Sequence, residues 1–192
     1  MINWTDWKNL TIEQFAGMVL EQEGLDIPVK VNKEGGNDIS FIDGLTEEDG
    51  QWVVEEDPYL RVPPVTMATF LKIERSYPAS KAPMAVVNEM IAYRMPEKAV
   101  KKSRLKPDQL LMLFTVLHEI GLYLDFKATP LDEYIQKGLA RFDYMDALDA
   151  KCRAMPLNVG QKIYAKEYRK DPLEAAGDAY ATKAMKAYLR TF

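Results

Sequence analysis

The sequence predicts an α+β fold with a small N-terminal sheet and a mainly helical C-terminal half. The first hundred residues alternate short apolar segments with turn formers, whereas the residues after Pro96 follow the apolar periodicity of successive helices. With 192 residues, the chain is long enough to bury one hydrophobic core. We therefore expect a single domain over 1–192, with an α/β lobe over 1–96 and a helical lobe over 97–192.

The α/β lobe is expected to begin with a helix. Thr11 and Gln14 have the spacing of a capping box, and Gly24 ends the apolar-periodic segment that follows. Turn formers such as Asp43-Gly44 and Pro63-Pro64 then separate segments rich in β-branched and aromatic residues. We expect, in order, a helix over 11–22, strands over 27–31, 39–42 and 51–54, a helix over 65–76, and a strand over 84–93.

The helical lobe begins at Pro107, which suits the first turn of a helix. From there to Phe126 the apolar residues lie almost all round the helix axis, which is typical of a buried helix. Further helices are expected over 131–154, 159–168 and 172–189.

Composition excludes several function classes. The net charge is −4, so the chain has no general attraction for nucleic acid or for an anionic membrane, and we expect neither as a partner. Cys152 is the only cysteine, which excludes an internal disulfide. Because we find no secretion signal and no apolar run of membrane-spanning length, we expect a cytoplasmic protein.

The chemistry-bearing residues centre on His118, the only histidine, which is followed by Glu119 in the apolar helix. In the pattern His-Glu-x-x-His, two imidazoles one helical turn apart share a zinc ion, and the glutamate acts as general base on a zinc-bound water. Leu122 stands where the second histidine would be. A plain alternative is that His118 and Leu122 are ordinary core residues.

A second pair, Glu174 and Asp178, lies four residues apart on one face of the last predicted helix. Such a pair can give one carboxylate to a metal and the other to the metal-binding histidine. The competing interpretation is structural: Asp171 is a good N-cap, Glu174 could complete a capping box, and Asp178 could simply face solvent.

Residues 115–126 (TVLHEIGLYLDF) and 174–181 (EAAGDAYA) together resemble the gluzincin class of zinc metallopeptidases, and most closely the small ImmA/IrrE-type and phage-borne members. The resemblance implies a zincin-like fold, zinc as cofactor, and a strand over 89–94 before the active-site helix. It also implies His118 and Glu174 as zinc ligands, Glu119 as catalytic base, and Asp178 as the residue that orients His118.

Leu122 breaks this pattern because its side chain offers no lone pair, and two protein ligands make a weak zinc site. We therefore expect an inactive or impaired metallopeptidase-like protein that works by binding a protein or peptide. An active peptidase that recruits Asp125 or Cys152 as a ligand is one alternative. Another is a helical regulatory or assembly protein with an accidental match, which predicts that Glu174 and Asp178 lie far from His118. A natural loss and an introduced substitution would both explain Leu122, and the intact Glu119 favours natural loss.

Overall fold

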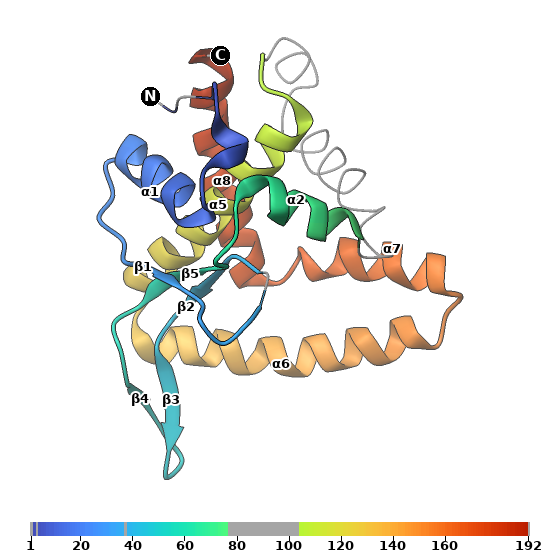
Figure 1. Cartoon of the computed structure of the whole chain (residues 1–192). Helices are drawn as coiled ribbons and strands as arrows, with labels where there is room; N and C mark the ends of the chain where they lie inside the picture. The colour runs from blue at the N-terminus through green and yellow to red at the C-terminus, as the bar shows by residue number, and fades with distance from the viewer. Residues whose placement is uncertain (1, 3, 37, 77–103, 192) are drawn as a thin grey trace.

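The computed structural model describes residues 2, 4–36, 38–76 and 104–191 (Figure 1). Its helices are α1 (Ile12–Glu23), α2 (Met67–Ser76), α5 (Pro107–Ala128), α6 (Leu131–Arg153), α7 (Leu157–Tyr168) and α8 (Pro172–Thr191). Its strands are β1 (Val29–Val31), β2 (Ser40–Ile42), β3 (Leu45–Glu48), β4 (Gln51–Val54) and β5 (Tyr59–Val62). The chain is α+β, with its strands in the N-terminal half and a mainly helical C-terminal half, as the sequence predicts. The strand expected over 84–93, the overlapping family strand over 89–94, and the boundary near Pro96 lie outside the described residues.

In the described part of the chain, the main sheet has three strands in the order β1-β5-β2. In the centre, β5 runs parallel to β1 and antiparallel to β2, and its residues Leu60 and Val62 are fully buried. This central strand was not predicted, because only four residues lie between Pro58 and Pro63. By contrast, the expected strands over 27–31, 39–42 and 51–54 are confirmed as β1, β2 and β4, the first two with shorter bounds.

Strand β3 was also missed, and it pairs with β4 in a separate two-stranded hairpin. The turn consists of Asp49 and Gly50, whose φ angles of 51° and 78° both lie in the left-handed region. Asp-Gly is among the strongest sequence signals for a two-residue hairpin turn of this kind. The strand before the turn was not predicted because Glu47 and Glu48 are not typical strand residues.

Helix α1 confirms the predicted capping box. The Thr11 hydroxyl accepts a hydrogen bond from the Gln14 N–H, and the Gln14 side chain accepts one from the Thr11 N–H. Gly24 ends the helix in the left-handed conformation. The apolar face of α1 packs on β1 and α5.

Helix α5 lies at the centre of the molecule and makes its most extensive contact with α8 (Figure 1). Six of its apolar side chains are less than 5 % exposed, and they join residues of α1, β5 and α8 in one hydrophobic core. They are Leu110, Met112, Leu113, Val116, Leu117 and Ile120. Among the described helices only this one, over Asp108–Ala128, has the length and composition of a membrane span. Its packing identifies it as the predicted core helix.

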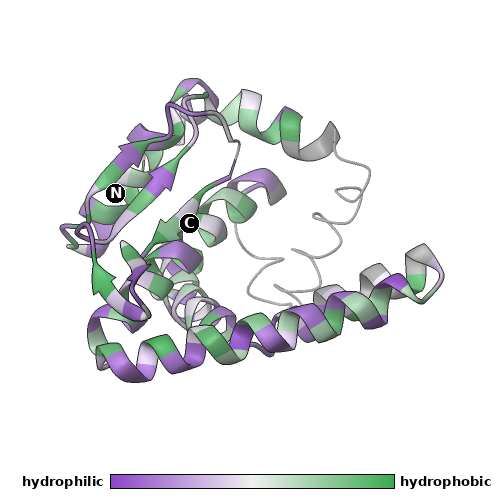
Figure 2. Ribbon diagram, turned by 90° about the horizontal axis from the view of Figure 1, so that it is seen from below, coloured by the Kyte–Doolittle hydropathy of each residue, from purple (hydrophilic) through white to green (hydrophobic). Residues whose placement is uncertain are grey.

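Helices α6 and α7 form an antiparallel hairpin that extends away from the rest of the described chain (Figures 1 and 2). The four predicted helices of the C-terminal half are present, and their bounds differ from the predictions by one or two residues. Figure 2 shows apolar and polar residues mixed along this hairpin.

Candidate functional site

Helices α5 and α8 approach so closely that no side chain fits between them at one point. A Cβ atom added to Gly121 would lie 2.8 Å from the Cα of Gly177, and one added to Gly177 would lie 2.8 Å from Cε1 of His118. Glycine inside a helix costs about 1 kcal/mol relative to alanine, so such a position needs a packing reason. Here the reason is that the two glycines let His118 reach the carboxylates of α8.

His118 lies between the two acidic residues predicted to accompany it. Its Nδ1 is 3.1 Å from Oδ1 of Asp178, and its Nε2 is 3.3 Å from Oε2 of Glu174. The His118 side chain is 13 % exposed and Asp178 is fully buried, so Asp178 is not the solvent-facing residue of the plain alternative. The accidental-match hypothesis predicts a large separation between these groups, and the distances are those of direct contact.

Glu174 is not the second half of a capping box. Asp171 does cap α8, since its Oδ1 accepts hydrogen bonds from the N–H groups of Leu173 and Glu174. The N–H of Asp171, however, donates to the carbonyl of Tyr168, and the Glu174 carboxylate turns toward His118. The structure therefore assigns the capping role to Asp171 alone.

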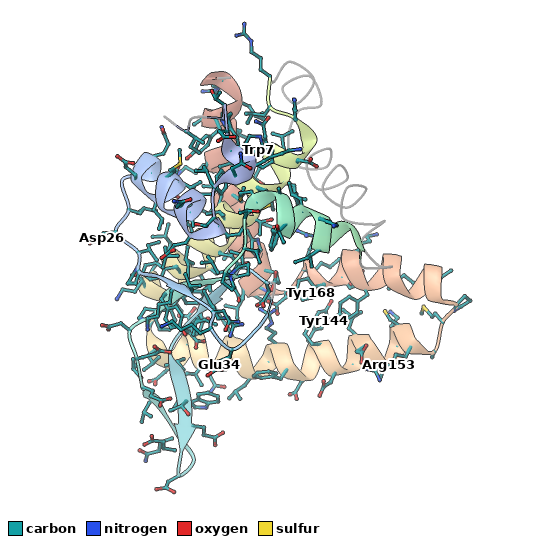
Figure 3. The ribbon with its side chains drawn as sticks, viewed as in Figure 1. Trp7, Asp26, Glu34, Tyr144, Arg153 and Tyr168 are labelled. Carbon is teal, nitrogen blue, oxygen red and sulfur yellow. The ribbon has the colours of Figure 1, made fainter. Side chains whose placement is uncertain are left out.

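Two arginines and a tyrosine complete the cluster, and sequence reasoning gave none of them this role. Arg141 of α6 and the Tyr168 hydroxyl of α7 each donate to Oε1 of Glu174 at 2.6 Å, and Tyr168 lies between α6 and α7 (Figure 3). Arg169, which follows α7, donates to both carboxylate oxygens of Asp178 at 3.0 Å. Each buried carboxylate thus has an arginine partner as well as the histidine.

These contacts determine the protonation of the cluster. Burial lowers the pKa of His118, but the hydrogen bonds to Asp178 and Glu174 outweigh that effect and raise the pKa to about 9. Burial raises the pKa of Glu174, and its bonds to His118 and Tyr168 more than compensate, so that its pKa falls to about 2. At neutral pH the histidine is an imidazolium that faces two carboxylates.

Glu119, the predicted base, has a different environment. Its Oε2 accepts a hydrogen bond of 2.7 Å from the N–H of Phe41 in β2, which ties the sheet to the central helix. Burial raises the pKa of Glu119 to about 7, although the charge of His118 and the Phe41 N–H oppose that shift. Near neutral pH this side chain therefore exchanges between its neutral and charged forms.

A cavity of about 580 Å³ opens beside the cluster. His118, Glu119 and Glu174 line its polar part together with Arg141 and Tyr168. The apolar part is lined by residues of β2, of the β3–β4 hairpin and of α6, among them Phe41, Leu45, Trp52, Ile135, Leu139 and Phe142. Leu122 faces the same cavity, one turn of α5 after His118.

The residues present do not fit a catalytic zinc ion. Nε2 of His118 and Oε2 of Glu174 are 3.3 Å apart, which suits two ligands with bonds of about 2.0–2.1 Å to one tetrahedral metal. The third position, however, is occupied by the hydrocarbon side chain of Leu122. Neither Asp125 nor Cys152 lines the cavity, and the described part of the chain contains no group of three His, Cys, Asp or Glu side chains that could hold a metal.

The site therefore combines a charged cluster, satisfied within the chain, with a largely apolar cavity beside a strand. This arrangement offers shape and apolar surface to a ligand. Comparison of the chain with protein-family models, with curated proteins and with solved structures finds no match.

Proposed function

We propose that this chain is a zincin-like protein that has lost the catalytic zinc site and that acts by binding a peptide segment of a partner protein. The observation that carries the proposal is the position of Leu122. It lines the cavity beside His118 and Glu119, at the place where the metallopeptidase pattern requires a second imidazole. The other three positions of the pattern are filled by residues of the expected types.

The surroundings of Glu174 support the loss of metal chemistry. Oε1 of this carboxylate accepts hydrogen bonds from Arg141 and Tyr168, and its charge is balanced by Arg141 and His118. A metal-binding imidazole must be neutral with a free lone pair. The two carboxylates favour the imidazolium form of His118, so a metal ion would have to displace its Nε2 proton and compete with the ion pair to Glu174.

The cavity supports peptide binding because one wall is β2, which among the described strands lies at the edge of the main sheet. Residues 39–43, which include β2, line the cavity, while β2 pairs with β5 on its other side. The N–H of Phe41 points toward Glu119, away from β5. An extended segment beside such an edge can place alternate side chains in the cavity. The single reduced cysteine, Cys152, fits a cytoplasmic setting for this activity.

Metal analysis of the purified protein, together with one substitution, tests the proposal. The wild-type chain is expected to contain far less than one zinc per molecule. Leu122→His should bring zinc to about one per chain, because it supplies the missing ligand next to His118 and Glu174. Leu124→His is the matched control, since Leu124 is a partly buried leucine of the same helix that does not line the cavity.

Circular dichroism establishes that each variant is folded before its metal content is compared. Stoichiometric zinc in the wild-type protein, removed only by a chelator, would contradict the loss of the metal site and support the peptidase with a non-standard ligand set. A folded Leu122→His variant that takes up no more zinc than Leu124→His would contradict the zincin-like origin of the cluster.

A further inference from the structure

An apolar stripe on α6 continues the cavity onto the surface. Leu131, Ile135, Leu139 and Phe142 lie within about 80° of one another around the helix axis, given the α-helical advance of about 100° per residue. Ile135, Leu139 and Phe142 line the cavity. Yet Phe142 is 65 % exposed and Leu139 is 41 % exposed. Exposed apolar surface that is continuous with a cavity is typical of a binding site.

The opposite wall is one face of the β3–β4 hairpin. Directly opposed residues of an antiparallel pair share a face, and Leu45 is paired with Val54 and Glu47 with Trp52. Leu45 and Trp52 line the cavity. The exposed Glu47 therefore lies on the cavity-facing side of the hairpin, next to Trp52.

Acidic residues lie at this opening, since Asp43 lines the cavity and Glu47 lies beside it on the hairpin. From Asp38 to Pro58 the sequence contains eight aspartates and glutamates and no lysine, arginine or histidine, and two of these acids, Asp38 and Glu56, are paired with Arg61 and Lys30. On α6 the exposed Asp146 follows on the same face as Phe142 and Leu139, whereas Lys137 and Lys151 are rotated by roughly 140–180° from Phe142. Arg153 shares the face of Phe142 three turns further along, where it is paired with Asp149. The cations deep in the site, His118 and Arg141, are already paired with the carboxylates of α8. Among the described residues at this opening, Asp43, Glu47 and Asp146 form no ion pair with a cation, so a ligand that enters meets net negative charge from them.

We propose that the groove between the β3–β4 hairpin and α6 binds a cationic peptide segment, with one or two large apolar side chains in the cavity and lysine or arginine side chains on either side. This inference rests on the proposed peptide-binding function and specifies the chemistry of the partner. A second copy of this chain is a poor occupant, because it would bring a second acidic rim against the first. Anionic lipid is repelled for the same reason.

Fluorescence anisotropy with four labelled octapeptides tests the inference. KKSLFSKK is the expected ligand, QQSLFSQQ and EESLFSEE remove and reverse its charge, and KKSSSSKK removes its apolar residues. KKSLFSKK should bind about fivefold or more tightly than QQSLFSQQ, and its affinity should fall as salt is raised. EESLFSEE and KKSSSSKK should bind more weakly than either.

Matched variants test whether the peptide binds in the groove between the β3–β4 hairpin and α6. Phe142→Ser should weaken binding of KKSLFSKK, whereas Val159→Ser, at an exposed apolar residue of α7, should not. The pair Glu47→Gln and Asp146→Asn should remove most of the preference for lysine. The control pair Glu21→Gln and Asp26→Asn should retain it, because Glu21 lies in α1 and Asp26 follows that helix, both are exposed, and neither lines the cavity.

Each contrary outcome has a different meaning. Equal affinity for KKSLFSKK and QQSLFSQQ, with both lost in Phe142→Ser, would overturn the cationic preference and leave the peptide-binding function intact. Equal affinity for KKSSSSKK would show nonspecific charge attraction and overturn the inference. Failure of all four peptides to bind folded protein would overturn both proposals. A wild-type dimer that Phe142→Ser converts to monomer in sedimentation would show that the groove binds a second copy instead.

Discussion

Gly177 packs directly against the ring of His118, and a Cβ atom at this position would lie 2.8 Å from Cε1 and 2.9 Å from Nδ1 of that ring. The site consequently depends on a residue that has no functional group. It also depends on Gly121, which faces Gly177 across the contact between α5 and α8.

Gly177→Ala is expected to destabilise the protein by about 1–3 kcal/mol, because the added methyl group overpacks the helix contact and displaces His118 from Asp178. Gly17→Ala is the matched control. It lies in α1 with no atom within 4 Å of an added Cβ, so it should stabilise the protein by about 0.5–1 kcal/mol. Urea unfolding of the two variants measures both effects. A Gly177→Ala variant as stable as Gly17→Ala would contradict the close contact.

Titration of His118 by NMR should give a pKa near 9, and because this is the only histidine its signal needs no assignment among others. The sign of the stability effect follows from linkage. The folded pKa lies above the unfolded value of about 6.5, so the imidazolium contributes its full stabilisation below pH 6.5 and loses it as the pH rises through about 9.

The corresponding measurement is the free energy of unfolding of wild type relative to His118→Gln at several pH values. The advantage of wild type should shrink between pH 6.5 and pH 9.5 by on the order of 1–3 kcal/mol. A constant difference across that range would show that the ring is neutral throughout.

Arg141→Met is expected to cost about 1–3 kcal/mol, because it leaves the Glu174 carboxylate buried without its strongest hydrogen-bond donor. The guanidinium is 26 % exposed, so the effect should fall below that of a fully buried pair. Lys137→Met provides the comparison, since the pair of Lys137 with the exposed Glu133 is a surface ion pair worth less than about 1 kcal/mol. Adding Glu174→Gln should remove most of the cost of Arg141→Met. Additive costs in that double mutant would contradict a direct coupling.

The helices of this fold could be predicted from the sequence because the residues that begin and end them are close together in the chain. Thr11 and Gln14 specify a capping box, and Pro107 and Pro172 mark the first turns of α5 and α8. Strand β5 has no comparable local signal, because its four residues become the centre of the sheet only through pairing with β1 and β2. Strand β3 is followed by Asp49-Gly50, a sequence typical of a hairpin turn. The strand was nevertheless not predicted, because Glu47 and Glu48 are not typical strand residues.

The residues of the site likewise fall into those that the sequence predicts and those that it does not. The spacing of Glu174 and Asp178 on one helix face, together with His118, predicted the contact that the structure contains. Arg141, Arg169 and Phe41 were not predicted, because each reaches the site from another element and an isolated arginine on a helix has no local signature. Gly121 and Gly177 did have a local signature, because glycine in the middle of a helix indicates close packing, and both lie within the segments that resemble the metallopeptidase pattern.

The arginines beside α8 have a consequence for how the protein is made. A protein that balances buried carboxylates with a metal ion cannot complete its fold until that ion arrives, and its abundance then follows the supply of zinc. Here Arg141, Arg169 and His118 provide the positive charge from within the chain. The finished protein should therefore accumulate equally in zinc-starved and zinc-replete cells.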